Sequence, residues 1–151
     1  MPRDRDHLPL VYSCSGCSSA AQVAHHLAVR LDRAGLVEMS CIAGVGGNVP
    51  SLVRKAEEAI ASGRGVLAID GCALQCVKAC LAQRGLEATA HVRLDLHGVK
   101  KEYHADADPD ASEPLYDRLV TQVRAMAALS EPLPGSCGGG CGCAAARAAA
   151  T

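Results

Sequence analysis

Short apolar runs alternate with helix-like patterns along the first half of the chain. Three apolar runs have the length of buried strands, and they cover residues 8–12, 36–42 and 65–69. After each run, apolar residues recur every three or four positions, as on one face of a helix; these patterns cover residues 18–34, 50–62 and 72–83. Ser18 or Ser19 can cap the first helix, and Pro50 suits the first turn of the second. The pattern predicts three consecutive strand–helix units.

The second half of the chain predicts one more strand, one more helix and a tail. Residues 89–96 alternate between apolar and polar side chains, which is the period of a half-exposed strand at a sheet edge. Ser112 can cap a last helix, whose apolar face holds Leu115, Leu119, Val120, Val123 and Met126. From Pro132 the composition changes to glycine, cysteine and alanine, with too little apolar bulk to pack.

This order of elements predicts the fold class. Strands that alternate with helices are typical of α/β domains, in which right-handed crossovers place helices on both faces of a parallel sheet. We predict one such domain over residues 8–130, a three-layer, Rossmann-like arrangement with a mostly parallel sheet of about four strands. A flexible Cys/Gly-rich C-terminal tail is expected over residues 131–151.

Composition narrows the range of functions. The chain carries 15 Lys and Arg against 16 Asp and Glu, so it has no excess of basic residues for nucleic acid or an anionic membrane. It has no Trp or Phe and three Tyr, so residues that stack on bases are scarce. No segment has the length of a membrane span, and the first apolar run is too short for a signal peptide. We expect a cytoplasmic protein without nucleic-acid or membrane partners.

Nine cysteines point to thiol chemistry. An odd number cannot all pair within the chain, and clustered thiols in a reducing compartment more often bind metals or exchange electrons than form structural disulfides. Cys14, Cys41 and Cys72 come at or just after the ends of the three predicted parallel strands. Because these strand ends meet at one edge of the sheet, we expect the three thiols to lie together. Cys17 and Cys76, about one helical turn further on, should reach the same edge.

Such a cluster suits a soft metal. Four thiolates can coordinate zinc tetrahedrally, with Zn–S distances of about 2.3 Å, or hold an iron–sulfur cluster. Helix N-termini lower thiol pKa values and so favour the thiolate form that a metal needs. The spacing Cys14-Ser-Gly-Cys17 also fits a dithiol redox pair or a sulfur carrier, and this alternative stays open.

Other residues carry weaker signals. Cys80 shares a helical stripe with Cys72 and Cys76, and it fits the site and the core equally well. The tail cysteines either form a flexible chelator or have no role; they are Cys137, Cys141 and Cys143. Glycines in residues 44–47 lack a nucleotide-binding pattern and should let backbone pass close to the thiols. Asp70 is expected in an Asx turn, with a role as acceptor for turn amides behind the thiols as the alternative. His91 is placed on the surface with the other histidines.

Four stretches of the sequence resemble the DGC domain family of zinc-binding proteins, which is named for the motif found here at residues 70–72. The stretches are residues 13–16, 41–47, 69–76 and 94–98. The resemblance implies that zinc is held by four cysteines, Cys14, Cys41, Cys72 and Cys76. Cys17, Cys80 and the tail cysteines are additions to the simpler family pattern, and Cys17 could serve as an alternate or fifth thiol. We predict a protein that binds a metal ion, zinc first, or handles it with the tail as donor or acceptor. An iron–sulfur cluster, and thiol redox or sulfur-transfer chemistry at Cys14 and Cys17, are the alternatives.

Overall fold

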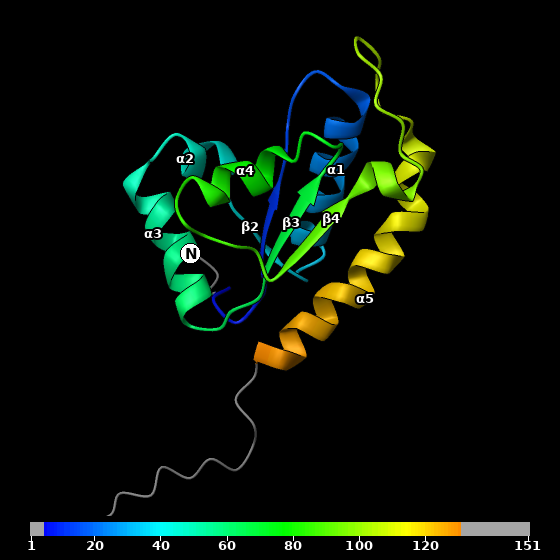
Figure 1. The fold of residues 1–151 in the computed structure, drawn as a ribbon. Helices are drawn as coiled ribbons and strands as arrows, with labels where there is room; N and C mark the ends of the chain where they lie inside the picture. Colours follow the sequence, from blue (N-terminus) through cyan, green and yellow to red (C-terminus); the bar gives the residue numbers. More distant parts are fainter. Residues whose placement is uncertain (1–4, 131–151) are drawn as a thin grey trace, which may run out of the picture.

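All four strands of the structure run parallel in one sheet. The computed structural model describes residues 5–130. Its strands are β1 (Leu10–Ser13), β2 (Glu38–Met39), β3 (Val66–Asp70) and β4 (Ala90–Arg93), in the spatial order β2-β1-β3-β4. In Figure 1 the arrowheads point toward the same edge of the sheet. The ends of β1 and β3, the two central strands, therefore meet at that edge, where the chain order along the sheet reverses and a ligand crevice is expected.

Helices cover both faces of this sheet. They are α1 (Ser19–Arg33), α2 (Ile42–Gly46), α3 (Pro50–Ala61), α4 (Cys76–Ala82) and α5 (Glu113–Ser130), with 3-10 turns η1 (Leu94–His97) and η2 (Pro109–Ser112). Figure 1 shows α1 and α5 on one face and α2, α3 and α4 on the other. The predicted three-layer α/β arrangement is confirmed. The predicted tail, with its three cysteines, lies outside the described residues.

The two central strands and α1 form the core. Every residue of β1 and β3 is buried, because both of their faces are covered by helices. Helix α1 packs against them with an alanine-rich face and two leucines, Leu27 and Leu31, that are fully buried. Burial of each leucine side chain contributes about 1.5–3 kcal/mol. Within residues 5–130, no helix is long and apolar enough to cross a membrane.

Local capping explains where α1 begins. Ser18 takes an extended conformation at the N-cap, and its hydroxyl accepts a hydrogen bond from Ala21 N at 3.3 Å. The neighbouring Ser19 bonds to a distant segment instead, because its Oγ accepts a hydrogen bond from Glu102 N at 2.9 Å and donates one to Lys100 O at 3.0 Å. Ser18 therefore starts the helix, whereas Ser19 fastens the chain around residue 101 against it.

The second predicted unit is corrected by the structure. The strand expected at 36–42 is only the pair Glu38–Met39, and the turn expected after it contains α2. Val45 of α2 is fully buried, so a helix here adds apolar surface to the core that an open turn would leave exposed. A Cβ on Gly46 would lie 2.8 Å from Cys80 Sγ. The glycines therefore do let backbone approach a thiol, but within a helix.

Three other boundaries differ from prediction. Helix α4 begins at Cys76 rather than at residue 72, because Gln75 takes a left-handed conformation (φ 51°) that interrupts any earlier helix. The edge strand β4 stops at Arg93, and Leu96 in the following turn is 68 % exposed. Ser112 immediately precedes α5, but its hydroxyl donates a hydrogen bond to Pro109 O inside η2.

Candidate functional site

The turn after β3 is built around the carboxylate of Asp70, which is 1 % exposed. Its Oδ1 accepts a hydrogen bond from Val77 N at 2.8 Å, and its Oδ2 accepts one from Lys78 N at 3.3 Å. Both amides belong to the first turn of α4, where Gln75 provides no side-chain cap. Asp70 therefore caps α4 from the end of β3, with its negative charge at the positive end of the helix. This arrangement replaces the expected Asx turn.

Gly71 brings the same turn directly against α1. A Cβ on residue 71 would lie 2.5 Å from the carbonyl oxygen of Ala20 and 2.9 Å from Ala21 N. These are backbone atoms of α1, so they cannot move aside without shifting the helix. The amide of Gly71 donates a hydrogen bond to Cys14 Sγ at 3.2 Å. Residue 71 therefore has to be small, and it ties the turn to β1 and α1 together.

Cys14 is the buried member of the cysteine group. It follows β1 directly and is 7 % exposed. Burial raises the pKa of its thiol to about 11; the hydrogen bond from Gly71 opposes the rise, while Asp70, Cys76 and Cys72 add to it. The hydrogen bond from Gly71 N to Cys14 Sγ places Cys14 beside the turn that carries Cys72, at the edge where β1 and β3 end. We call this edge the mouth.

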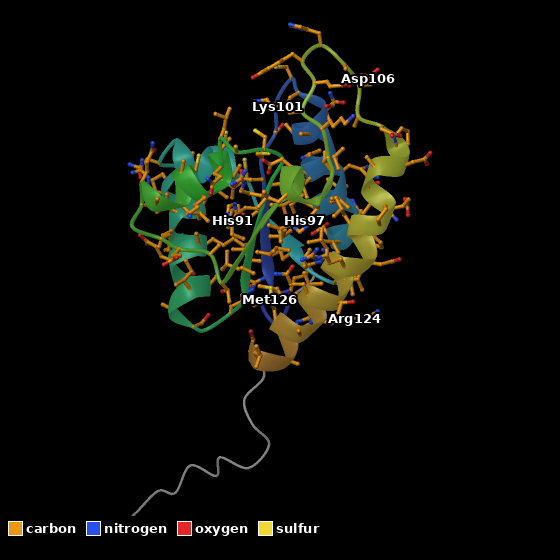
Figure 2. All side chains as sticks on the ribbon, turned by 45° about the vertical axis from the view of Figure 1, so that its right-hand side comes forward. His91, His97, Lys101, Asp106, Arg124 and Met126 are labelled. Carbon is orange, nitrogen blue, oxygen red and sulfur yellow. The ribbon has the colours of Figure 1, made fainter. Side chains whose placement is uncertain are left out.

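Cys72 lies in the loop between Gly71 and α4 and is half-buried. Lys101 approaches it from the chain segment that Ser19 fastens to α1. Tyr103 raises the pKa of Lys101, and Cys72 adds to that rise; the Lys101 ammonium also lies 4.8 Å from the Tyr103 ring centroid. Figure 2 shows Lys101 at the carboxyl edge of the sheet, beside the start of α1. A positive charge therefore stands at the mouth, and no sequence signal singled it out.

Cys76 and Cys80 occupy successive turns of α4. Cys76 is exposed at the first position of the helix, and Cys80 is half-buried against Gly46 of α2. Burial raises the pKa of Cys80, and Cys76 and Asp70 add to the rise while Arg84 lowers it. Cys80 is thus both a neighbour of Cys76 and a packing residue between two helices.

Cys17 and Cys41 are exposed at the same edge of the sheet. Cys17 precedes the Ser18 cap and follows Gly16, whose φ of 156° is in a region that favours glycine. Cys41 occupies the N-cap position of α2 and lines a shallow hollow of about 500 Å³ on the β2 side. Burial raises the pKa of Tyr12, and Cys41 contributes to that rise. Neither cysteine is among the groups that act on Cys14.

Several cysteines lie at this edge of the sheet, but they do not form a complete set of metal ligands. All six cysteines from 14 to 80 are free thiols. Within residues 5–130, no three His, Cys, Asp or Glu side chains are arranged so that they could hold a metal ion. The donors at the mouth are nevertheless of the soft type that zinc, copper(I) and iron–sulfur clusters prefer. Of the three cysteines proposed nearest to the strand ends, Cys14 is buried, Cys72 is half-buried and Cys76 is exposed.

His91 belongs to this region although the sequence indicated only a surface histidine. Its Nε2 lies 2.9 Å from Asp70 Oδ2, and its side chain is 22 % exposed. The register explains the contact, because His91 pairs with Ala68 and Arg93 with Asp70 across β3 and β4. Only the parallel pairing brings the two residues together, so neither segment alone could indicate the contact.

Comparisons with known proteins support the family resemblance found in the sequence. The sequence model of the DGC domain matches residues 10–119, so this chain belongs to the DGC domain family. It is also 56 % identical over 119 residues to the anaerobic and virulence modulator AnvM of Pseudomonas aeruginosa, an alignment that covers 77 % of this chain and 88 % of AnvM. No solved structure matches. The resemblance predicted from the four short stretches is confirmed and extends through β4 into α5.

Proposed function

We propose that this chain is a cysteine-based regulatory protein of the cytoplasm, and that it binds a soft metal ion, zinc first, at the mouth formed by the ends of β1 and β3. Cys14, Cys72 and Cys76 would hold the ion. Cys41 would be the fourth ligand, and Cys17 would be its alternate. The observation that carries the proposal is the hydrogen bond from Gly71 N to the buried Cys14 Sγ at 3.2 Å, which joins the end of β1 to the turn that carries Cys72.

The surroundings of Cys14 support this role. Its sulfur accepts a hydrogen bond from Gly71 N at 3.2 Å, so the sulfur is oriented before any ligand arrives. Such a bond compensates part of the negative charge of a thiolate and helps to fix a ligand in place. Asp70 holds the start of α4, and thereby Cys76, through two backbone amides. These two bonds fix where α4 begins, and with it the position of Cys76 in the backbone.

Zinc bound by thiolates would supply a cross-link without redox chemistry of its own. Here the chain would join β1, the turn after β3 and α4 through this cross-link. Because Cys14 holds its proton up to about pH 11 in the free protein, metal binding has to displace that proton. Affinity should therefore rise with pH over the neutral range.

A thiol redox function through Cys14 and Cys17 fits less well. Cys17 is exposed and could attack, but Cys14, which would have to resolve the mixed disulfide, is buried and its raised pKa leaves it as a thiol. An iron–sulfur cluster uses the same donor atoms as zinc, and an absorption spectrum separates the two because only the cluster is coloured. AnvM is named an anaerobic and virulence modulator, and that name supports a regulatory role for the proposed metal site.

The test uses the full chain, purified without oxygen, with serine at positions 137, 141 and 143 so that tail thiols do not bind the metal. We expect one zinc ion per chain and a colourless protein. Loss of a group that only supports a metal ligand costs about 10–100-fold in affinity, so loss of a ligand itself, in Cys72→Ser or Cys76→Ser, should cost at least about 100-fold. Cys80→Ala, which removes a neighbouring thiol with a packing role, is the matched control and should retain the ion.

Two further variants decide the fourth ligand. Cys41→Ser should weaken binding as strongly as Cys72→Ser, whereas Cys17→Ser should leave the affinity within about threefold. The reverse result would assign Cys17 to the site. A protein that contains no metal after anaerobic purification, and that has no measurable affinity for zinc, would refute metal binding altogether.

A further inference from the structure

A second hollow lies away from the thiols, between α4 and the edge strand β4. It has a volume of about 430 Å³, within the range of small-molecule sites. Ala68 of β3, Leu81 of α4 and Leu86 and Ala88 of the following loop form its apolar lining. The hollow exists because α4 has only seven residues and ends at Ala82, which leaves part of the sheet beside β4 uncovered.

One polar group in this hollow is held in a fixed orientation. His91 lines it, and its Nε2 lies 2.9 Å from Asp70 Oδ2. Asp70 already accepts two backbone hydrogen bonds, so its oxygens act as acceptors and Nε2 of His91 must carry the proton. Figure 2 shows that His91 lies deeper along the sheet than Lys101, which marks the thiol mouth.

Two opposite charges complete the lining. Lys78 of α4 and Glu87 of the loop both border the hollow, and both are exposed. Neither side chain forms an ion pair within the described part of the chain, and they do not pair with each other. The hollow therefore offers a cation, an anion and an imidazole of fixed orientation around an apolar floor.

We propose that this hollow binds a small zwitterion, namely a free α-amino acid with an apolar side chain. The side chain would cover the apolar lining, and the carboxylate would face the ammonium of Lys78. The ammonium of the ligand would face the carboxylate of Glu87. Lys78 and Glu87 would thus each face a group of opposite charge on the same molecule. The inference goes beyond the proposed metal site, because no cysteine lines this hollow.

The occupant can be tested with three molecules that share the same 3-methylbutyl carbons. L-leucine carries both charges, 4-methylpentanoate carries the carboxylate alone and isopentylamine carries the ammonium alone. Each is titrated into the uniformly 15N-labelled full chain while amide shifts are followed by NMR. We expect saturable shifts with L-leucine at β3, β4 and α4, with a Kd of about 1 mM or below, and binding at least about tenfold weaker for both fragments.

Two surface variants identify the contacts. Lys78→Met keeps the backbone amide that bonds to Asp70, and it should remove the advantage of leucine over isopentylamine. Glu87→Gln should remove the advantage of leucine over 4-methylpentanoate. Lys100→Met, a loss of positive charge at an exposed residue outside the hollow, is the matched control and should leave all three affinities unchanged.

Several outcomes would overturn the assignment. No saturable shift with L-leucine at about 10 mM, tenfold above the expected Kd, would show that the hollow has no such ligand. If leucine and one of the two fragments bind with equal affinity, the hollow recognises only one of the two charges of leucine. That result would contradict a zwitterion site. The metal-free protein serves for all titrations, so failure here leaves the metal proposal unaffected, and failure of metal binding leaves this test intact.

Discussion

Asp70 offers the most direct test of how this turn is held together. In Asp70→Ala three hydrogen bonds to a buried carboxylate disappear: those from Val77 N at 2.8 Å, from Lys78 N at 3.3 Å and from His91 Nε2 at 2.9 Å. Loss of a helix cap costs about 1 kcal/mol. Val77 N, the fully buried donor of the three, costs a further amount of about 1–3 kcal/mol when it has no partner. We expect the free energy of unfolding to fall by about 2–4 kcal/mol.

Asp70→Asn removes the negative charge of the side chain and keeps its shape, so it tests the two contributions separately. The asparagine retains one oxygen for Val77 N, and its amide can donate to His91 if the imidazole changes tautomer. The bond to Lys78 N and the charge at the helix end are lost. The expected decrease is about 1–2 kcal/mol, between the wild type and Asp70→Ala.

The assay is urea unfolding followed by far-ultraviolet circular dichroism, in the presence of a chelator so that metal binding does not contribute. For a chain of this size, a loss of about 3 kcal/mol corresponds to a decrease in Tm of about 6–12 °C. Asp108→Ala is the control, because Asp108 caps an exposed 3-10 turn through Asp110 N at 3.0 Å. It should lose less than about 1 kcal/mol. Stability of both Asp70 variants within about 0.5 kcal/mol of the wild type would refute the capping role.

Three further predictions concern packing and protonation. Gly71→Ala should lower the free energy of unfolding by more than about 2 kcal/mol in urea titrations, since its Cβ would lie 2.5 Å from the Ala20 carbonyl oxygen. Gly46→Ala should cost about 1–2 kcal/mol in the same assay, and Cys80→Ala should relieve most of that loss, because the contact at 2.8 Å is with Cys80 Sγ. The pKa of Cys14 is raised from 9.0 to about 11, so the folded state keeps a proton that the unfolded state loses. Stability should therefore decrease as pH rises from about 9 to about 11, and less so in Cys14→Ala.

Each of these three predictions would be contradicted by a different result. A wild-type stability for Gly71→Ala would mean that the turn and α1 separate easily. Additive losses in the double variant Gly46→Ala/Cys80→Ala would place the strain elsewhere than at the sulfur. For Cys14, alkylation by iodoacetamide gives an independent measure; a midpoint near pH 9 instead of near 11 would show that the thiol is not buried in solution.

The sequence predicted the sheet well because its signals are local. The apolar runs that became β1 and β3 are buried on both faces, and such runs stand out in any sequence. Ser18 and Pro50 mark helix starts by their own chemistry, and both lie where predicted. The contact between Cys14 and the turn after β3 followed from topology alone, since the ends of parallel strands meet at one edge.

What the sequence could not predict depends on contacts between distant segments. The cap on α4 comes from Asp70 in a strand, and the partner of Asp70 is His91 in the next strand. Cys72 fits a helical stripe by spacing, yet Gln75 in a left-handed conformation keeps it outside α4. Lys101 reaches the thiols because Ser19 fastens its segment to α1. None of these relations has a signature within a few residues.

X-ray absorption at the zinc edge tests the central proposal most directly. The sample is the anaerobically loaded full chain with serine at positions 137, 141 and 143. A first shell of sulfur alone, at about 2.3 Å, is expected, and Cys14→Ser should replace one sulfur by a lighter atom or abolish loading. A shell of oxygen and nitrogen, or a shell unchanged in Cys14→Ser, would contradict a zinc site built on Cys14.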